Sequence, residues 1–312
     1  MASDQDLHGM RACHGATPAS VVTHPSPPAS HHISKHMLQH HPQAEMILAM
    51  AIGDKAIRAA VIDRANCVSA LPPRYCPLHA DVTDIVNALR AVIAAAGNVD
   101  AVGIILPSPA AAASASTGGT YSAALAALQE CELRAKLACA LPLRVIHYSN
   151  AVLLGEVHAG AAQGRRRAAA VIIGHGGVDS AMIIDGQLLC DPLGAPAAIV
   201  RIADRPCRVG RVADELCGQA LLARMPDVHS LAELEARART GDFRCQRLWT
   251  DFGLDLAETL QTWQADLLPD RIVLGGPIAG ALPLFREVLG DLPVVAASLP
   301  DAALVGAAAL FA

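Results

Sequence analysis

The chain has 312 residues and a net charge of -5, with 53% hydrophobic, 17% charged and 3% aromatic residues. This length favours two lobes over one, and the apolar content is far above that of disordered chains. The negative charge excludes general attraction to nucleic acid, and the lack of a membrane-length apolar stretch or secretory leader predicts a cytoplasmic protein without membrane contacts.

Residues 1–45 are rich in Pro, Ser and His and show no apolar periodicity, which predicts a flexible tail. The segment holds eight of the thirteen histidines: His8, His14, His24, His31, His32, His36, His40 and His41. No fixed Cys/His spacing supports a structural metal site among them.

Residues 46–148 form a predicted N-terminal α/β lobe. Two apolar strands on either side of Gly53 predict a β-hairpin, and Asp81 or Thr83 is suited to cap the helix that follows. The expected elements are strands at 46–52, 57–63, 101–106 and 143–146 and helices at 81–96 and 121–138.

Residues 149–300 form a predicted C-terminal α/β lobe that repeats this order. The expected elements are a helix at 150–161, strands at 168–173, 180–184 and 271–274, and helices between 213 and 268. Glycines follow two of the strands, where ligands of such sheets bind. The nine cysteines are an odd number scattered along the chain, and we expect them to be reduced core residues.

Several segments, in order and spacing, resemble the ROK family of sugar kinases and sugar-responsive regulators. Residues 150–156 are similar to that family's Asp-Ala-Asn-Ala-Ala-Ala-Leu-Gly-Glu helix. Residues 183–188, 271–276 and 303–309 resemble its second hairpin, its nucleotide-side strand and its terminal helix. The resemblance covers nearly all of the chain after the tail.

The resemblance implies an actin/hexokinase-type α/β fold of two ribonuclease H-like lobes, in which sugar and ATP meet in an interdomain cleft. It implies that the helix at 301–312 packs on the N-terminal lobe. It also makes a sugar, ATP and Mg²⁺ candidate ligands and a homodimer a candidate assembly, because family members often form dimers.

The family's first hairpin carries Asp-x-Gly-Gly-Thr, whose glycines let backbone amides approach phosphates while the carboxylate organises the metal. The matching residues here are Ala51, Ile52, Gly53, Asp54 and Lys55. Ala51 therefore stands at the metal-carboxylate position, and phosphate binding should be weakened. In an alternative, Asp54 holds the metal and Lys55 pairs with phosphate.

The resemblance places Tyr148 at the position of the family's catalytic base. A phenol stays protonated at neutral pH, so it does not accept the proton of a sugar hydroxyl. His147 is an alternative base, but alternation along a strand would turn its side chain away from that of Tyr148.

The family's sugar clamp and zinc cluster are also altered. Ala198 stands at the Glu position of the clamp and Arg201 at its His position, while Val209 replaces a zinc-binding Cys. Cys207 and Cys217 supply too few ligands, so we expect no zinc. The remaining sugar-cleft candidates are Asn150, Glu156, Ala198 and Arg201.

Two glycine turns retain features of a nucleotide site. Gly174, Gly176 and Gly177 match part of the second phosphate turn, and Gly275 with Gly276 match the adenosine side; glycine turns are also how strands reverse. The sequence predicts an inactive or strongly impaired ROK protein with a ligand-binding or regulatory role. The alternative is an ATP-dependent hexose or N-acetylhexosamine kinase with relocated residues such as Asp54 or Asp179.

Overall fold

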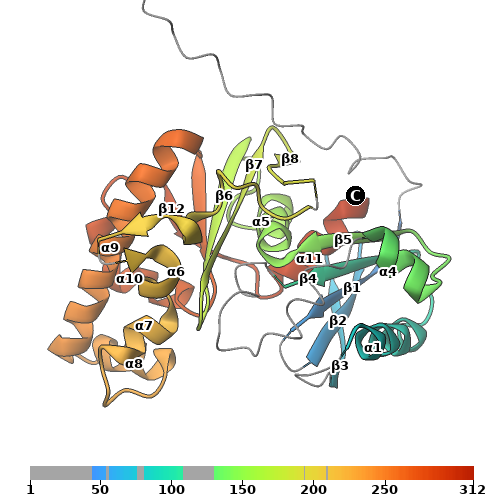
Figure 1. The fold of residues 1–312 in the computed structure, drawn as a ribbon, viewed down its shortest axis with the longest axis horizontal. Coiled ribbons are helices and arrows are strands. Elements are labelled where there is room, and N and C mark those ends of the chain that lie inside the picture. Colours follow the sequence, from blue (N-terminus) through green and yellow to red (C-terminus); the bar gives the residue numbers. More distant parts are fainter. Residues whose placement is uncertain (1–43, 54–55, 76–80, 108–129, 193, 209) are drawn as a thin grey trace, which may run out of the picture. The chain divides into compact units, whose positions relative to one another are not determined.

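The computed structural model describes residues 44–53, 56–75, 81–107, 130–192, 194–208 and 210–312. Two five-stranded sheets organise these residues (Figure 1). The predicted tail, Asp54, Lys55, Val209 and the first part of the helix expected at 121–138 lie outside them.

The first sheet has the strand order β3-β2-β1-β4-β5. Its strands are β1 (Met46–Ile52), β2 (Ala56–Asp63), β3 (Val68–Tyr75), β4 (Ala101–Leu106) and β5 (Leu143–His147). β1, β2 and β3 pair antiparallel, whereas β4 pairs parallel with both β1 and β5. β1 is buried on both faces beyond its first residue, which explains its unbroken apolar sequence.

Two helices, α1 (Val82–Ala95) and α4 (Glu130–Leu137), belong to an apolar cluster on one face of this sheet. α1 begins with a capping box in which the Asp84 amide donates to the Asp81 side chain at 2.9 Å. The predicted helix start at Asp81 is therefore confirmed. Ile85, Val86, Leu89 and Val92 form the buried stripe of α1.

The second sheet has the order β12-β11-β6-β7-β8. Its strands are β6 (Arg167–Ile173), β7 (Val178–Ile184), β8 (Gln187–Leu188), β11 (Arg271–Gly275) and β12 (Val294–Ala296). β11 pairs parallel with β6 and β12, and β7 pairs antiparallel with β6 and β8.

Short elements and two longer helices pack against this sheet around an aromatic core. Trp249 stacks on Phe285 with ring centroids 5.7 Å apart, and Phe252 meets both rings edge-on. The elements are η3 (Ile202–Asp204), β9 (Pro206–Cys207), β10 (Gly210–Arg211), α6 (Val212–Glu215), α7 (Gly218–Ala223), α8 (Leu231–Arg239), α9 (Phe243–Leu267), η4 (Ala279–Ala281), α10 (Leu282–Phe285) and η5 (Glu287–Leu289).

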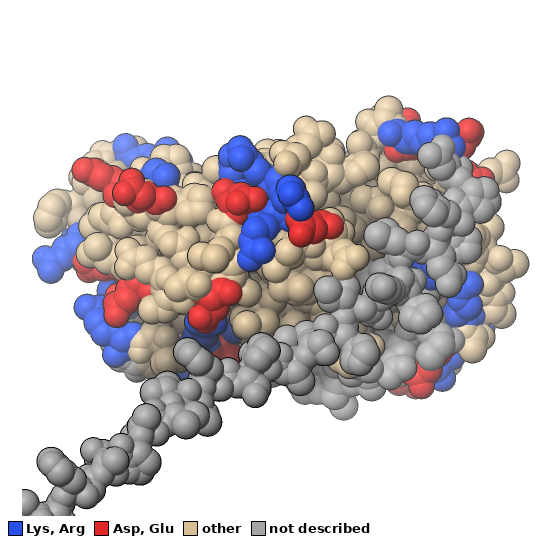
Figure 2. All heavy atoms as spheres, turned by 90° about the horizontal axis from the view of Figure 1, so that it is seen from above, with Lys and Arg blue, Asp and Glu red and all other residues tan. Residues whose placement is uncertain are grey.

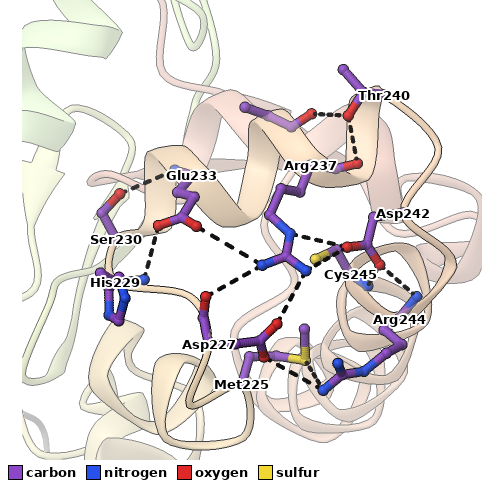
Figure 3. Close-up of polar contacts among 11 residues, drawn as sticks. Met225, Asp227, His229, Ser230, Glu233, Arg237, Thr240, Asp242, Arg244 and Cys245 are labelled. Carbon is purple, nitrogen blue, oxygen red and sulfur yellow. Dashed lines mark hydrogen bonds and ion pairs between the residues drawn. The ribbon is translucent and has the colours of Figure 1, made fainter.

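An ionic network joins α8 to the start of α9 (Figure 3). The Arg237 guanidinium donates to Asp242 at 2.7 Å and to Asp227 at 3.1 Å. Asp242 also caps α9 by accepting from the Arg244 and Cys245 amides. On the face drawn in Figure 2, basic and acidic side chains likewise lie beside one another.

Helices α5 (Tyr148–Ala159) and α11 (Ala302–Ala308), the latter followed by η6 (Ala309–Phe311), share one apolar cluster with residues of both sheets. The two helices cross in close contact (Figure 1). A Cβ atom on Gly155 would lie 2.0 Å from the Ala302 carbonyl oxygen, and one on Gly306 would lie 1.8 Å from that of Ala151. Only glycine permits this backbone approach.

The expected α/β class and most elements are confirmed, with several corrections. β3 and β12 were not predicted, and the helix expected from residue 150 begins at Tyr148. Cys67 is exposed rather than in the core, whereas Cys217 and Cys245 are buried. The proposed lobe boundary at 148/149 falls in the first turn of α5 and stays a prediction.

Candidate functional site

The carboxyl ends of β5 and β11 open onto a pocket of about 280 Å³. Tyr148 directly follows β5, while Gly275 ends β11 and Gly276 follows it, and all three line the pocket. In α/β sheets, ligands usually bind beyond the carboxyl ends of the strands. The lining residues are Arg58, Tyr148, Val152, Gly275, Gly276, Ala279, Ala297, Leu299, Pro300, Asp301, Ala302, Ala303 and Leu304.

Arg58 reaches this pocket from β2. Arg58 lies directly across the hairpin from Ala51, and Ala51 occupies the expected metal-carboxylate position. Residues directly opposite in antiparallel strands point to the same face of a sheet, so Arg58 shares the face on which Ala51 is buried. The exposed Arg58 guanidinium makes no hydrogen bond or ion pair in the described structure. Sequence reasoning did not single out Arg58.

Tyr148 is the first residue of α5 and is half-buried in the pocket wall. The expectation that His147 and Tyr148 alternate along a strand is wrong, because β5 ends at His147 and the helix starts next. His147 is buried, and its Nδ1 lies 3.3 Å from the Pro107 carbonyl oxygen. His147 is not among the residues that line the pocket.

The first turn of α5 carries unused polar groups. His147 at the N-cap provides no side-chain hydrogen bond to the helix, and the turn contains no acidic residue. The Ser149 hydroxyl and the Asn150 amide oxygen are fully buried without a hydrogen-bond partner in the described structure. The donors left at this end of α5 are the uncapped backbone amides and the Ser149 hydroxyl, whereas the Asn150 amide oxygen can only accept.

Asp301 supplies the one carboxylate among the described residues that line the pocket. It precedes α11, and its side chain caps no amide of that helix. Although Asp301 and Arg58 line the same pocket, no ion pair joins them in the described structure. One negative and one positive side chain are thus both available to a ligand.

The two glycines at the end of β11 are needed for the fold itself. Gly276 has a φ of +84°, and an added Cβ atom there would lie 2.3 Å from the Ile173 carbonyl oxygen. A Cβ atom on Gly275 would lie 2.5 Å from Ile172 Cδ1. Their use in nucleotide binding stays a prediction, since backbone packing already accounts for both.

The other predicted nucleotide glycines lie outside the lining of this pocket. Gly174 donates to the Gly177 carbonyl at 2.8 Å, and its own carbonyl accepts from the Gly218 amide at 3.0 Å. Gly176 belongs to the same turn. Gly53 is an exposed hairpin residue whose amide donates to the Ala56 carbonyl at 3.1 Å.

Glu156 is fully buried and serves as a hydrogen-bond acceptor for the backbone. Its carboxylate accepts from the amides of Ala161, Ser298 and Leu299 at 2.7–2.9 Å and from the Ser298 hydroxyl at 3.0 Å. It does not line the pocket. Glu156 ties α5 to the loop before α11, and its expected place in a sugar cleft stays a prediction.

Asn150 is fully buried as well, and its amide nitrogen donates to the Gly194 carbonyl at 3.0 Å and to Cys190 Sγ at 3.2 Å. Burial, followed by the negative charge of Asp191, raises the pKa of the Cys190 thiol to about 12, with the Asn150 hydrogen bond acting in the opposite direction. Cys190 is therefore a neutral packing partner of Asn150 at neutral pH.

Ala198 and Arg201, the altered sugar-clamp positions, do not line the pocket. Ala198 is exposed, and Arg201 pairs with Asp204 at 3.1 Å. Cys207 lies half-buried on β9 and Cys217 is the buried N-cap of α7. Among the described residues, no group of three or more His, Cys, Asp or Glu is placed to hold a metal.

The sequence model of the ROK family matches residues 47–312. The chain belongs to the ROK family. No curated protein matches it. Solved ROK structures share its fold at low sequence identity: the ROK hexokinase of Thermus thermophilus has 20% identity and a TM-score of 0.63, covering 85% of this chain and 98% of that one.

A ROK glucokinase of Streptomyces griseus, solved with glucose and AMPPNP, has 21% identity and a TM-score of 0.65, covering 85% of this chain and 98% of that one. A ROK transcriptional regulator, a homolog of the E. coli MLC protein, has 19% identity and a TM-score of 0.64, covering 85% of this chain and 77% of that one. The expected family and fold class are confirmed. No helix among the described residues is long and apolar enough to cross a membrane.

Proposed function

We propose that this ROK protein binds a small ligand in the pocket at Tyr148 and does not phosphorylate it at the rate of a working kinase. The observation that carries the proposal is that Arg58 lines the pocket and lies directly across the hairpin from Ala51, the position where the family's metal carboxylate is expected. A cation stands there where phosphate transfer needs a metal-binding anion.

Tyr148 supports the same conclusion. Its side chain lines the pocket at the position that the family resemblance gives to the catalytic base. A protonated phenol does not take the proton of an attacking hydroxyl, and loss of a general base lowers a rate by about 10²–10⁴-fold. This loss adds to the loss of metal binding.

The residues present do not fit a catalytic Mg²⁺. Mg²⁺ takes oxygen ligands in octahedral geometry and usually needs one or two carboxylates beside the phosphates. Ala51 has none, and Asp301 is the single carboxylate among the described lining residues. Arg58 on the same wall would repel a divalent cation.

A ligand-binding or regulatory role is supported by the surviving pocket and by a family that contains regulators as well as kinases. Both roles use the same scaffold, since function is carried by sites and not by the fold. A homodimer and a cytoplasmic location stay predictions.

The purified full-length chain should be incubated with ATP, Mg²⁺ and a panel of hexoses and N-acetylhexosamines, beside an active ROK glucokinase as positive control. We expect no turnover approaching about 1 s⁻¹, the lower end of common enzyme rates. Turnover above that value would overturn the proposal.

An ATP-dependent kinase with relocated residues is the second candidate, and Asp301 is the observation that favours it. Its carboxylate is in the pocket and caps no helix amide, so it is free to accept a proton or a metal. In that case Asp301→Asn should remove activity that the unmodified chain shows in the same assay. Of the earlier candidates, Asp179 does not line the pocket, and Asp54 lies outside the described residues.

A further inference from the structure

The first hairpin contributes a positive charge, that of Arg58, to the pocket wall. The family resemblance predicts a carboxylate at position 51, whereas the chain has Ala51 there and Arg58 directly opposite it. Because both positions lie on one face of the sheet, the change replaces an anion by a cation at one place. A carboxylate here would bind Mg²⁺, which in turn would bind phosphate, whereas the Arg58 guanidinium can bind phosphate directly.

Arg58 is available for this contact. It lines the pocket, and its guanidinium has no hydrogen-bond or ion-pair partner in the described structure. A guanidinium offers a planar set of donors that matches two phosphate oxygens at once, and it keeps its charge at all physiological pH values. A free arginine in a pocket is thus a complete phosphate-binding group without a metal.

The opposite charge in the same pocket limits the ligand further. The Asp301 carboxylate accepts hydrogen bonds only, and it forms no ion pair with Arg58 in the described structure. A ligand that satisfies both side chains needs an anionic group for Arg58 and hydrogen-bond donors, such as hydroxyls, for Asp301. The volume of about 280 Å³ is near the lower limit of small-molecule pockets, which favours a compact ligand.

We propose that the pocket binds a phosphate monoester that carries free hydroxyls, without a divalent metal, and that Arg58 is its phosphate-binding residue. Asp301 accepts from the hydroxyls of the ligand, and the Tyr148 hydroxyl on the same wall is a further donor. The proposal rests on the proposed function, because a site that transferred phosphate from ATP would need the metal that this site disfavours.

The test is isothermal titration calorimetry on the full-length chain with glucose 6-phosphate, N-acetylglucosamine 6-phosphate, AMP and unphosphorylated glucose. Each ligand is titrated once in EDTA and once in Mg²⁺. We expect at least one phosphate monoester to bind equally well in both buffers. Tighter binding of a sugar phosphate than of AMP identifies a sugar as the carrier of the phosphate, and the reverse identifies a nucleotide.

Arg58→Ala should weaken that binding roughly 10- to 100-fold, the effect of losing hydrogen bonds to a charged group. Arg58→Lys should lose less affinity than Arg58→Ala, because lysine keeps the positive charge although it lacks the planar donors. Arg74→Ala is the matched control: Arg74 is an exposed arginine on β3 opposite Ile57, on the other face of the sheet. It should bind as the unmodified chain does.

Phosphate binding that requires Mg²⁺, or a dissociation constant that changes less than twofold in Arg58→Ala, overturns the inference. Binding of glucose with no binding of any phosphate monoester overturns it too, while the proposed ligand-binding function survives. Turnover of ATP in the kinase assay would overturn the proposed function itself, whatever the result of the calorimetry.

Discussion

Glu156 accepts hydrogen bonds from both the backbone amide and the hydroxyl of Ser298, at 2.8 and 3.0 Å. Ser298 lies in the loop that leads to α11, and its neighbours Leu299 and Pro300 line the pocket. One buried carboxylate thus holds a part of the pocket wall against α5. Glu156, a sugar-cleft candidate from the sequence, thus holds the backbone around the pocket.

Replacing Glu156 by Ala should lower the free energy of unfolding by about 2–3 kcal/mol, because buried amide donors lose their acceptor. Urea denaturation followed by circular dichroism measures the change. Glu258→Ala, at an exposed position of α9, is the control and should stay within about 0.5 kcal/mol. A loss below about 1 kcal/mol in Glu156→Ala would mean that the loop does not depend on the carboxylate.

Gly155→Ala and Gly306→Ala should each destabilise the chain by about 3 kcal/mol or more. The added methyl group would meet a backbone carbonyl at 2.0 or 1.8 Å, and backbone cannot rotate away as a side chain does. Thermal unfolding gives a direct comparison with Gly177→Ala, whose Cβ atom would meet nothing within 4 Å. Equal melting temperatures for all three variants would contradict the close crossing of α5 and α11.

Acid should weaken the fold partly through the Arg237 network. The hydrogen bond from Arg237, followed by one from the Cys245 amide, lowers the pKa of the Asp242 carboxyl. A carboxyl whose pKa is lower in the folded chain stabilises the fold above its unfolded pKa of about 4, and this stabilisation is lost as the pH falls through the folded pKa. The same direction holds for Asp227.

Urea midpoints at pH 7, 5 and 3 should therefore fall less with acid in Arg237→Gln than in the unmodified chain. Arg247→Gln is the control, because its pair with Asp251 spans 4.0 Å and both side chains are well exposed. The explanation fails if Arg237→Gln keeps the pH dependence of the unmodified protein.

Restoring kinase activity should require three changes and not two. Ala51→Asp with Tyr148→Asp supplies both missing carboxylates, but the new carboxylate at position 51 would face Arg58 and pair with it instead of with Mg²⁺. Adding Arg58→Ala should release it and raise the rate at least about 10²-fold over the double variant. Coupled ADP detection measures the rate, and equal rates would show that Arg58 does not block the metal.

The elements predicted best are those whose sequence signals lie within a few consecutive residues. The hairpin of β1 and β2 and the capped start of α1 follow from apolar runs and from Asp81, all of which are read within a few residues. The first residue of α5 was missed because β5 continues into the helix without a glycine or a capping side chain between them. Propensity alone does not mark such a junction.

The candidate site was harder to predict, because the pocket is assembled by register and by long connections. Arg58 becomes relevant only when β2 is aligned with Ala51, and a one-residue slip would turn it to the other face. Asp301 is far from both in sequence and carries no motif. In contrast, Tyr148 was predicted at the site because the resemblance gave its position directly.

The exposed edge strand β3 has a consequence for how the protein behaves at high concentration. Pro72 and Pro73 lie where the register between β2 and β3 is irregular, and neither has an amide hydrogen. A strand from another molecule that approached this edge would meet a gap in the row of donors it needs. Growth of the sheet by addition of further chains is therefore blocked at β3.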